Sequence, residues 1–296
     1  MKIKKCFMAA LAVAAVACGA WLIGRSPKPD TRSNGSLTGG STVSTARVSV
    51  PTRARNHSDP ENGDIKTITL PGGAMMEMIY VAPGSFMMGS PKSEACRDGD
   101  EKQHRVTLTK GFWLGKYEVT QEQWKSVMGN NRSHFKWDDL PVENVSWEDC
   151  QEFIRKVNAQ LNCGARLPTE AEWEYACRAG TSGSYAYAGG SLDSMWHVGN
   201  NGVKTHPVGQ KSPNAWGFYD MHGNVYEWCN DWYGEYPSHS VTDPMGTASG
   251  DGRVLRGGCW ISYSYSCRSA SRSRSRPGNR SSGYGFRLCC SAGPRE

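Results

Sequence analysis

The sequence lacks the spacings that mark common metal and redox sites. No two cysteines are separated by two residues, and no two of the 7 histidines stand four positions apart. Neither a zinc pattern nor a helical histidine pair is therefore present. No nucleotide-binding, hydrolytic or redox-cofactor motif is recognisable. The formal net charge is only +6, which does not by itself favour a polyanionic partner. We therefore expect no nucleic acid among the partners of this chain.

A long apolar run occurs only near the N-terminus. Lysines at positions 2, 4 and 5 precede apolar residues 7–24, the arrangement of an export signal or an uncleaved anchor. Residues 15–18 resemble a lipoprotein cleavage box with Cys18 as the lipidated residue, whereas Trp21 and its neighbours extend the run toward membrane-spanning length. Both alternatives make residues 1–25 a signal peptide or membrane anchor. They hold the protein outside the cytoplasm, on the surface or in the periplasm of a bacterium.

The rest of the chain divides by composition. Residues 26–64 are rich in Ser, Thr, Gly, Pro, Asn and Arg, and this composition predicts a flexible linker. Residues 65–296 hold most of the 11 Trp and 34 Gly. We expect one α+β domain there, with few regular elements and long irregular stretches.

Local patterns predict the main elements of this domain. Helices should begin after Thr120, Ser146 and Thr169, which precede helical segments as N-caps. Residues 106–109 and 112–114 predict a hairpin around Lys110-Gly111. After the third helix, strands are expected only at 253–255 and 285–288.

Cysteine is plentiful beyond the signal segment. In an exported protein such a number predicts disulfides. An odd count leaves at least one thiol free or bonded to a partner. The residues are Cys96, Cys150, Cys163, Cys177, Cys229, Cys259, Cys267, Cys289 and Cys290.

The segment 257–290 has an unusual composition. Residues 262–266 alternate Ser with Tyr, a composition typical of binding loops, because Tyr supplies stiff contact area and Ser adaptable hydrogen bonding. A Ser/Arg-rich flexible tail is the alternative. Trp260, Cys267 and Phe286 bracket the run, which a tail does not need. The arginines of 268–276 are expected to line or flank a binding face and to pair with acidic ligands.

Seven ordered motifs resemble the formylglycine-generating-enzyme (sulfatase-modifying factor) domain family. They cover nearly everything after residue 70, which makes the resemblance highly specific. It implies a C-type-lectin-like α+β fold rich in irregular structure. The motifs are Pro83–Gly89, Glu118–Thr120, Pro141–Trp147, Arg166–Tyr175, Gly223–Trp228, Arg256–Gly258 and Gly285–Arg287.

Catalytic members of this family oxidise a substrate cysteine to formylglycine with copper held by two thiols. The matching positions here hold Gly257 and Ser262, and Cys259 is the only thiol within the loop. The resemblance also implies a Cys177–Cys267 disulfide, which removes the remaining thiol partner. Fold alone does not confer activity. We therefore favour a protein without catalysis; copper and a catalytic Cys259 apply only to the alternative, a formylglycine-generating oxidase.

Variable proteins of diversity-generating retroelements, such as the treponemal variable protein, a surface lipoprotein, are a second resemblance. In them a reverse transcriptase randomises template adenines, which turns Asn codons into codons for Ser, Tyr, Ile, Arg, Gly or Cys in a C-terminal segment. We therefore predict a diversified surface that binds an extracellular protein or another surface ligand; a plain structural module is a further alternative. The predicted contact residues are Trp260, Ile261, Ser262, Tyr263, Ser264, Tyr265, Ser266, Ser271, Ser273, Ser281, Ser282 and Tyr284.

The family resemblance also implies a structural calcium site. Asn224 and Glu227 stand in the Gly-Asn-x-x-Glu-Trp motif, and oxygen ligands at a tight turn suit a hard cation. The alternative is purely structural, with Asn224 capping the turn and Glu227 paired with an arginine.

Overall fold

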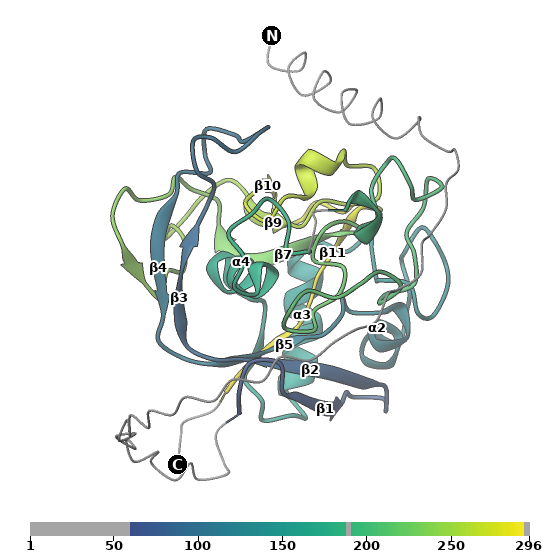
Figure 1. Cartoon of the computed structure of the whole chain (residues 1–296). Helices are drawn as coiled ribbons and strands as arrows, with labels where there is room; N and C mark the ends of the chain where they lie inside the picture. The colour runs from purple at the N-terminus through teal and green to yellow at the C-terminus, as the bar shows by residue number, and fades with distance from the viewer. Residues whose placement is uncertain (1–59, 188–190, 293–296) are drawn as a thin grey trace, which may run out of the picture. The chain divides into compact units, whose positions relative to one another are not determined.

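The computed structural model describes residues 60–187 and 191–292, which lie in the compact unit Pro60–Glu296. Three sheets and three short α-helices make up the regular part of this unit, and long loops connect them (Figure 1). The expected signal or anchor, including Cys18, lies outside the described residues. Within the described ranges, no helix has the length and apolar character needed to cross a bilayer.

The first sheet has five strands in the order β1-β2-β5-β12-β6. All its neighbouring pairs run antiparallel. The strand nearest the C-terminus, β12, lies between β5 and β6, so the segment after residue 257 returns to the interior of this sheet. The bounds are β1 Ile65–Thr69, β2 Met75–Val81, β5 Phe112–Gly115, β6 Ala165–Arg166 and β12 Cys289–Ser291.

Two smaller sheets complete the architecture. One has the order β10-β9-β7-β11 and the other β3-β4-β8. β11 joins β7 in parallel, and the β7–β9 register shifts between Trp228 and Trp232. The bounds are β3 Gly84–Met88, β4 His104–Leu108, β7 Tyr226–Trp232, β8 Val241–Thr242, β9 Arg253–Arg256, β10 Arg272–Ser275 and β11 Tyr284–Gly285.

The three predicted helices are confirmed. They are α2 Gln121–Met128, α3 Trp147–Asn158 and α4 Glu170–Arg178. Each begins with a complete capping box: the hydroxyl of the N-cap residue accepts from the N3 backbone N–H, and the N3 side chain accepts from the backbone N–H of the N-cap residue. Such caps contribute about 1 kcal/mol each. Two 3₁₀ turns, η2 Leu192–Ser194 and η3 Ser264–Cys267, occur in the loops.

The predicted hairpin around Lys110-Gly111 is wrong. β4 pairs with β3 and β8, whereas β5 pairs with β2 and β12. The three-residue link, residues 109–111, therefore carries the chain from one sheet to another. The predicted strand at 253–255 lies in β9, but of the range 285–288 only Gly285 lies in a strand, and β7, β8, β10 and β12 were missed.

Two hydrophobic cores lie on opposite faces of the first sheet. Met78 packs into one core and its neighbour Ile79 into the other, as expected for adjacent strand residues. The first core stacks Trp124 on Phe153 with ring centroids 5.5 Å apart, and Phe286 meets both rings edge-on. A buried side chain of this kind contributes about 1.5–3 kcal/mol. These cores fix the scaffold from which the C-terminal segment projects.

Candidate binding surface

The segment 257–290 leaves β9 through two glycines that the fold requires. Gly257 and Gly258 have φ of 92° and 79°, a region that side-chain-bearing residues rarely adopt. A Cβ on Gly258 would lie 2.5 Å from Cys267 Sγ. The turn therefore starts the segment at a fixed place and packs it tightly against η3.

The exposed large hydrophobic side chains of the segment lie in its aromatic run. Ile261, Tyr263 and Tyr265 are 54%, 51% and 38% exposed. The rings of Tyr263 and Tyr265 stack with centroids 5.5 Å apart and planes 11° apart. Large apolar side chains that lie together on the surface indicate a contact surface, because much of their area is still available for burial by a partner.

The backbone of this run is held by loops from elsewhere in the chain. The Val198 N–H donates to Ser262 O at 3.0 Å, and the Tyr185 hydroxyl donates to Ser264 O at 2.9 Å. Trp260 is half-buried: its indole Nε1 donates to Ser282 O at 2.9 Å, and its ring meets Phe135 edge-on at 5.4 Å. Trp260 is therefore an anchor of the surface rather than its most exposed contact.

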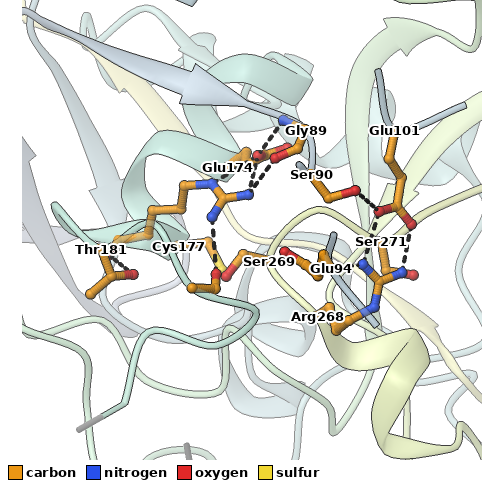
Figure 2. A network of polar contacts seen from close by, with 12 residues as sticks. Gly89, Ser90, Glu94, Glu101, Glu174, Cys177, Thr181, Arg268, Ser269 and Ser271 are labelled. Carbon is orange, nitrogen blue, oxygen red and sulfur yellow. Dashed lines mark hydrogen bonds and ion pairs between the residues drawn. The ribbon is translucent and has the colours of Figure 1, made fainter. Parts of the chain in front are cut away.

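Arg268 connects the segment to the loop that holds Glu94 and Glu101, and we call this set of contacts the Arg268 clamp. Its guanidinium donates to Glu94 at 2.7 Å and to both oxygens of Glu101 at 2.8 and 2.6 Å. Its Nε donates to Tyr265 O at 2.9 Å. Figure 2 shows the guanidinium facing Glu101, with Ser90 on the other side of that carboxylate. Sequence reasoning missed this clamp, because more than 160 positions separate Arg268 from its partners.

Two further arginines of the segment pair with carboxylates of their own chain. Arg272 makes two hydrogen bonds to buried Glu170, at 2.7 and 2.8 Å, and Arg280 pairs with Asp149. The expectation that residues 268–276 present arginines to acidic ligands is therefore wrong for Arg268 and Arg272. The side chains of Arg268 and Arg272 are 3% and 1% exposed, and each is buried against carboxylates of its own chain.

The predicted serine contacts divide into two groups. Ser262, Ser264 and Ser266 lie half-buried among the exposed rings, and Ser281 and Ser282 are half-buried near Trp260.

The remaining predicted contacts lie apart from this group. Ser271 is only 9% exposed and its carbonyl accepts from Arg256, so its place on the surface is corrected. Ser273 belongs to β10, and Tyr284 packs edge-on against Trp228. Backbone pairing at β10 and β11 turns these positions toward the scaffold.

A separate cavity of ≈ 280 Å³ lies beside β7 and β8. Among its lining residues are Glu170, Asp231, Tyr236 and Arg272. Burial raises the pKa of Asp231 to about 8, and the charge of Glu170 acts in the same direction. Asp231 accepts from the Glu170 N–H at 3.0 Å. No local sequence pattern indicates this group, since its members come from distant elements.

The sequence from β1 to β12 matches a known family. Residues 67–292 fit the model of the sulfatase-modifying factor enzyme 1-like domain. The chain belongs to this family. Its α+β fold, C-type-lectin-like and rich in irregular structure, is the predicted one, which is thereby confirmed.

Relatives of the family differ in their stated roles. The chaperone protein LppX of Paenibacillus barcinonensis is 36% identical and covers 53% of this chain and 71% of its own length. The formylglycine-generating enzyme of Mus musculus is 30% identical, over 72% of this chain and 75% of that enzyme. The chain spans only 37% of the serine/threonine-protein kinase pkn1 of Chlamydia caviae, at 33% identity.

A solved structure with the same fold is Treponema denticola variable protein 1. It superimposes with a TM-score of 0.70 and 33% identity, covering 77% of this chain and 99% of that one. Family members thus include both enzymes and variable proteins.

The thiols do not fit the copper centre of the catalytic family members well. Cys259 is 3% exposed, and burial raises its pKa. Burial also raises the pKa of Cys267, with a contribution from Cys259. Copper binding by two thiols requires thiolates. Cys259 Sγ lies 3.4 Å from Ser262 Oγ, and the Cys267 thiol donates to Tyr263 O at 3.7 Å. Two buried thiols that are hydrogen-bonded within their own chain do not fit a copper centre held by two thiolates.

The expected Cys177–Cys267 disulfide is not formed in the structure, which has both residues as free thiols. Cys177 Sγ lies 3.6 Å from His222 Nε2, and Nδ1 of the same ring contacts Cys267 O at 2.7 Å. His222 thus contacts the thiol of one cysteine and the backbone of the other.

The two predicted calcium ligands already have protein partners. Both Glu227 oxygens accept from Arg287, at 2.9 and 2.8 Å, and one also accepts from Trp173 Nε1 at 2.7 Å. Asn224 Oδ1 accepts from the His206 N–H, and its amide donates to Glu118. These contacts match the structural alternative, in which an arginine neutralises Glu227. Calcium here stays a prediction that metal binding must test.

Proposed function

We propose that this chain is an exported, membrane-anchored ligand-binding protein whose segment 257–290 presents a diversified surface. The observation that carries the proposal is the stacked, half-exposed Tyr263–Tyr265 pair beside exposed Ile261. Tyrosines are frequent anchors of binding energy, since each offers a large stiff ring and a hydroxyl. The expected ligand is an extracellular protein or another surface molecule.

Within the segment, backbone groups hold the run in place while side chains are displayed, and this arrangement supports the proposed function. The scaffold holds residues 262 and 264 through their backbone carbonyls, and these bonds do not depend on the side chain displayed. Residues 267–270, directly after the run, are buried. Surface substitutions away from such buried features usually change stability by less than about 0.5 kcal/mol. Residues 261 and 263–266 can therefore vary while the fold persists, whereas a change at Ser262 also removes the bond that its hydroxyl accepts from the Cys259 N–H at 3.0 Å.

Similarity to Treponema denticola variable protein 1 supports the same conclusion, as does the apolar N-terminal run expected to export and anchor the chain. The alternative, a formylglycine-generating oxidase, is favoured by the 30% identity to the mouse enzyme and by the free thiol of Cys267. Burial of both thiols weighs against it, because buried thiols are poor nucleophiles and poor metal ligands.

The test is deep sequencing of codons 257–290 across a growing population, together with the flanking DNA. We expect a template copy nearby, with substitutions confined to bases that are adenine in that copy. Codons derived from AAC keep their third base, so variation should fall on the first two. Codons 166–175 of the scaffold serve as the control and should stay constant. A uniform segment without a template copy would refute diversification.

A peptide assay separates binding from catalysis. The full chain is incubated with a sulfatase-derived cysteine peptide, copper and oxygen, and the peptide is analysed by mass spectrometry. We expect no conversion to the aldehyde. Conversion that is lost in the Cys259→Ser variant would establish the oxidase instead.

A further inference from the structure

Two cysteines outside the exposed run 261–266 lie in contact. Cys290 Sγ donates to Cys163 Sγ across 3.2 Å. Cys163 lies just before β6, and Cys290 is the middle residue of β12. They are 127 positions apart in the sequence. Their contact is therefore a product of the fold.

Backbone pairing holds this contact in place. Cys290 pairs with Ala165 and Cys289 with Arg166 in the antiparallel β12–β6 ladder. The Ser291 N–H also donates to Gly164 O at 3.3 Å. Both sulfurs thus project from backbone that the sheet has already fixed.

Strand geometry selects Cys290 over its neighbour. Cys290 belongs to the core on one face of the sheet, and Cys163 packs against the same core. Cys289 belongs to the core on the opposite face. Successive strand side chains alternate between faces. Only Cys290 of the two adjacent cysteines therefore faces Cys163.

The two thiols differ in the way that thiol–disulfide exchange requires. Cys163 is half-exposed, whereas Cys290 is buried. The hydrogen bond from Cys290 lowers the pKa of Cys163 to about 6, and the charge of Lys66 acts in the same direction. The same contact, together with burial, raises the pKa of Cys290. Cys163 is thus the accessible thiolate that attacks first, and Cys290 is the resolving thiol that attacks the mixed disulfide.

We propose that Cys163 and Cys290 are a disulfide-forming pair, oxidised by a small-molecule or protein disulfide. The Cys163 thiolate attacks one sulfur of the oxidant, forms a mixed disulfide and releases the first thiolate. Cys290 then loses its proton, attacks Cys163 Sγ and expels the second. Two protein thiols become one disulfide, and one external disulfide is reduced to two thiols.

The bond would fasten β12, the strand in which the segment 257–290 ends, to the residues just before β6. Its position in the sheet is independent of the side chains that residues 261–266 display. The consequence for display rests on the proposed function, whereas the bond itself does not. A constant segment in the sequencing experiment would leave the bond in place, and a missing bond would leave diversification untouched.

The test is a peptide map of the full chain after equilibration with oxidised glutathione. The protein is alkylated with iodoacetamide in denaturant without reductant and digested with trypsin. We expect a linked peptide pair joining residues 157–166 to 288–295, and no alkylated Cys163. Because Cys289 and Cys290 share one tryptic peptide, the variants Cys290→Ser and Cys289→Ser assign the bond.

The linked pair should disappear in Cys290→Ser and in Cys163→Ser, and should persist in the matched control Cys289→Ser. Alkylated Cys163 in the oxidised wild type would overturn the proposal. So would a linkage that survives in Cys290→Ser and is lost in Cys289→Ser. The wild-type map decides on the existence of the bond even where a variant fails to fold.

Discussion

Replacing Arg268 with Met should cost more stability than almost any other single change in the segment 257–290. The substitution keeps an unbranched side chain of similar length but leaves Glu94 and Glu101 without their cation. Those carboxylates are 6% and 0% exposed, and the arginine side chain is 3% exposed. Removing one partner from such a buried pair costs about 3–5 kcal/mol. In a domain of this size that lowers Tm by roughly 6–20 °C.

The matched control is Arg280→Met. Arg280 also pairs with a carboxylate through two hydrogen bonds, to Asp149 at 2.6 and 2.7 Å, but its side chain is 39% exposed. Exposed pairs contribute about 0–1 kcal/mol. Thermal and urea unfolding of both variants at pH 7 measures the difference. A loss for Arg268→Met no greater than that for Arg280→Met would refute the clamp.

The pH dependence gives the clamp a second signature. Burial raises the pKa of Glu101, but hydrogen bonds from Arg268 and Ser90 outweigh it and hold the pKa below its usual range. A carboxyl with a depressed pKa stabilises the fold above its unfolded pKa, and this stability is lost as pH falls through the folded pKa. The Arg268→Met variant should therefore lose less stability on acidification than the wild type does.

Three further outcomes are expected. Burial raises the pKa of Asp231 to about 8, so wild-type stability should fall as pH rises from its unfolded pKa toward 8. The free energy of unfolding in urea should fall less between pH 5 and pH 9 in Asp231→Asn than in the wild type. An equal fall in both proteins would contradict this prediction. Gly258→Ala should cost about 1–3 kcal/mol for its backbone, plus the overlap with Cys267. Gly180→Ala, at φ 87° with nothing within 4 Å, isolates the backbone cost, and equal losses would rule out the overlap. Added calcium should leave Tm unchanged, because Glu227 is already neutralised by arginine; a rise that EDTA reverses would restore the calcium site.

The helices were predictable because their signals are local. Each cap and its N3 partner stand three positions apart, and the structure contains all three boxes. The glycine turn at 257–258 and the exposed Ser/Tyr run follow from the same kind of short-range chemistry. Such features need no knowledge of the tertiary structure.

The missed elements depend on distant partners. β7 places Glu227 and Asp231 in the interior, so its hydrophobic pattern does not alternate as an isolated strand should. Glu227 is tolerated there because Arg287, 60 positions later, neutralises it. The same holds for Arg268, whose charge suggested a surface residue until Glu94 and Glu101 were placed beside it. Buried ion pairs between distant residues leave no mark on local periodicity.

The position of β12 has a consequence for synthesis. It lies between β5 and β6, and its residues 289–291 are translated at the very end of the segment 257–290. A frameshift or premature stop within that segment therefore removes an interior strand and leaves two strand edges unpaired. Exposed edges of this kind are prone to aggregate and to be degraded. Only chains that are read in frame as far as residue 291 therefore complete the first sheet.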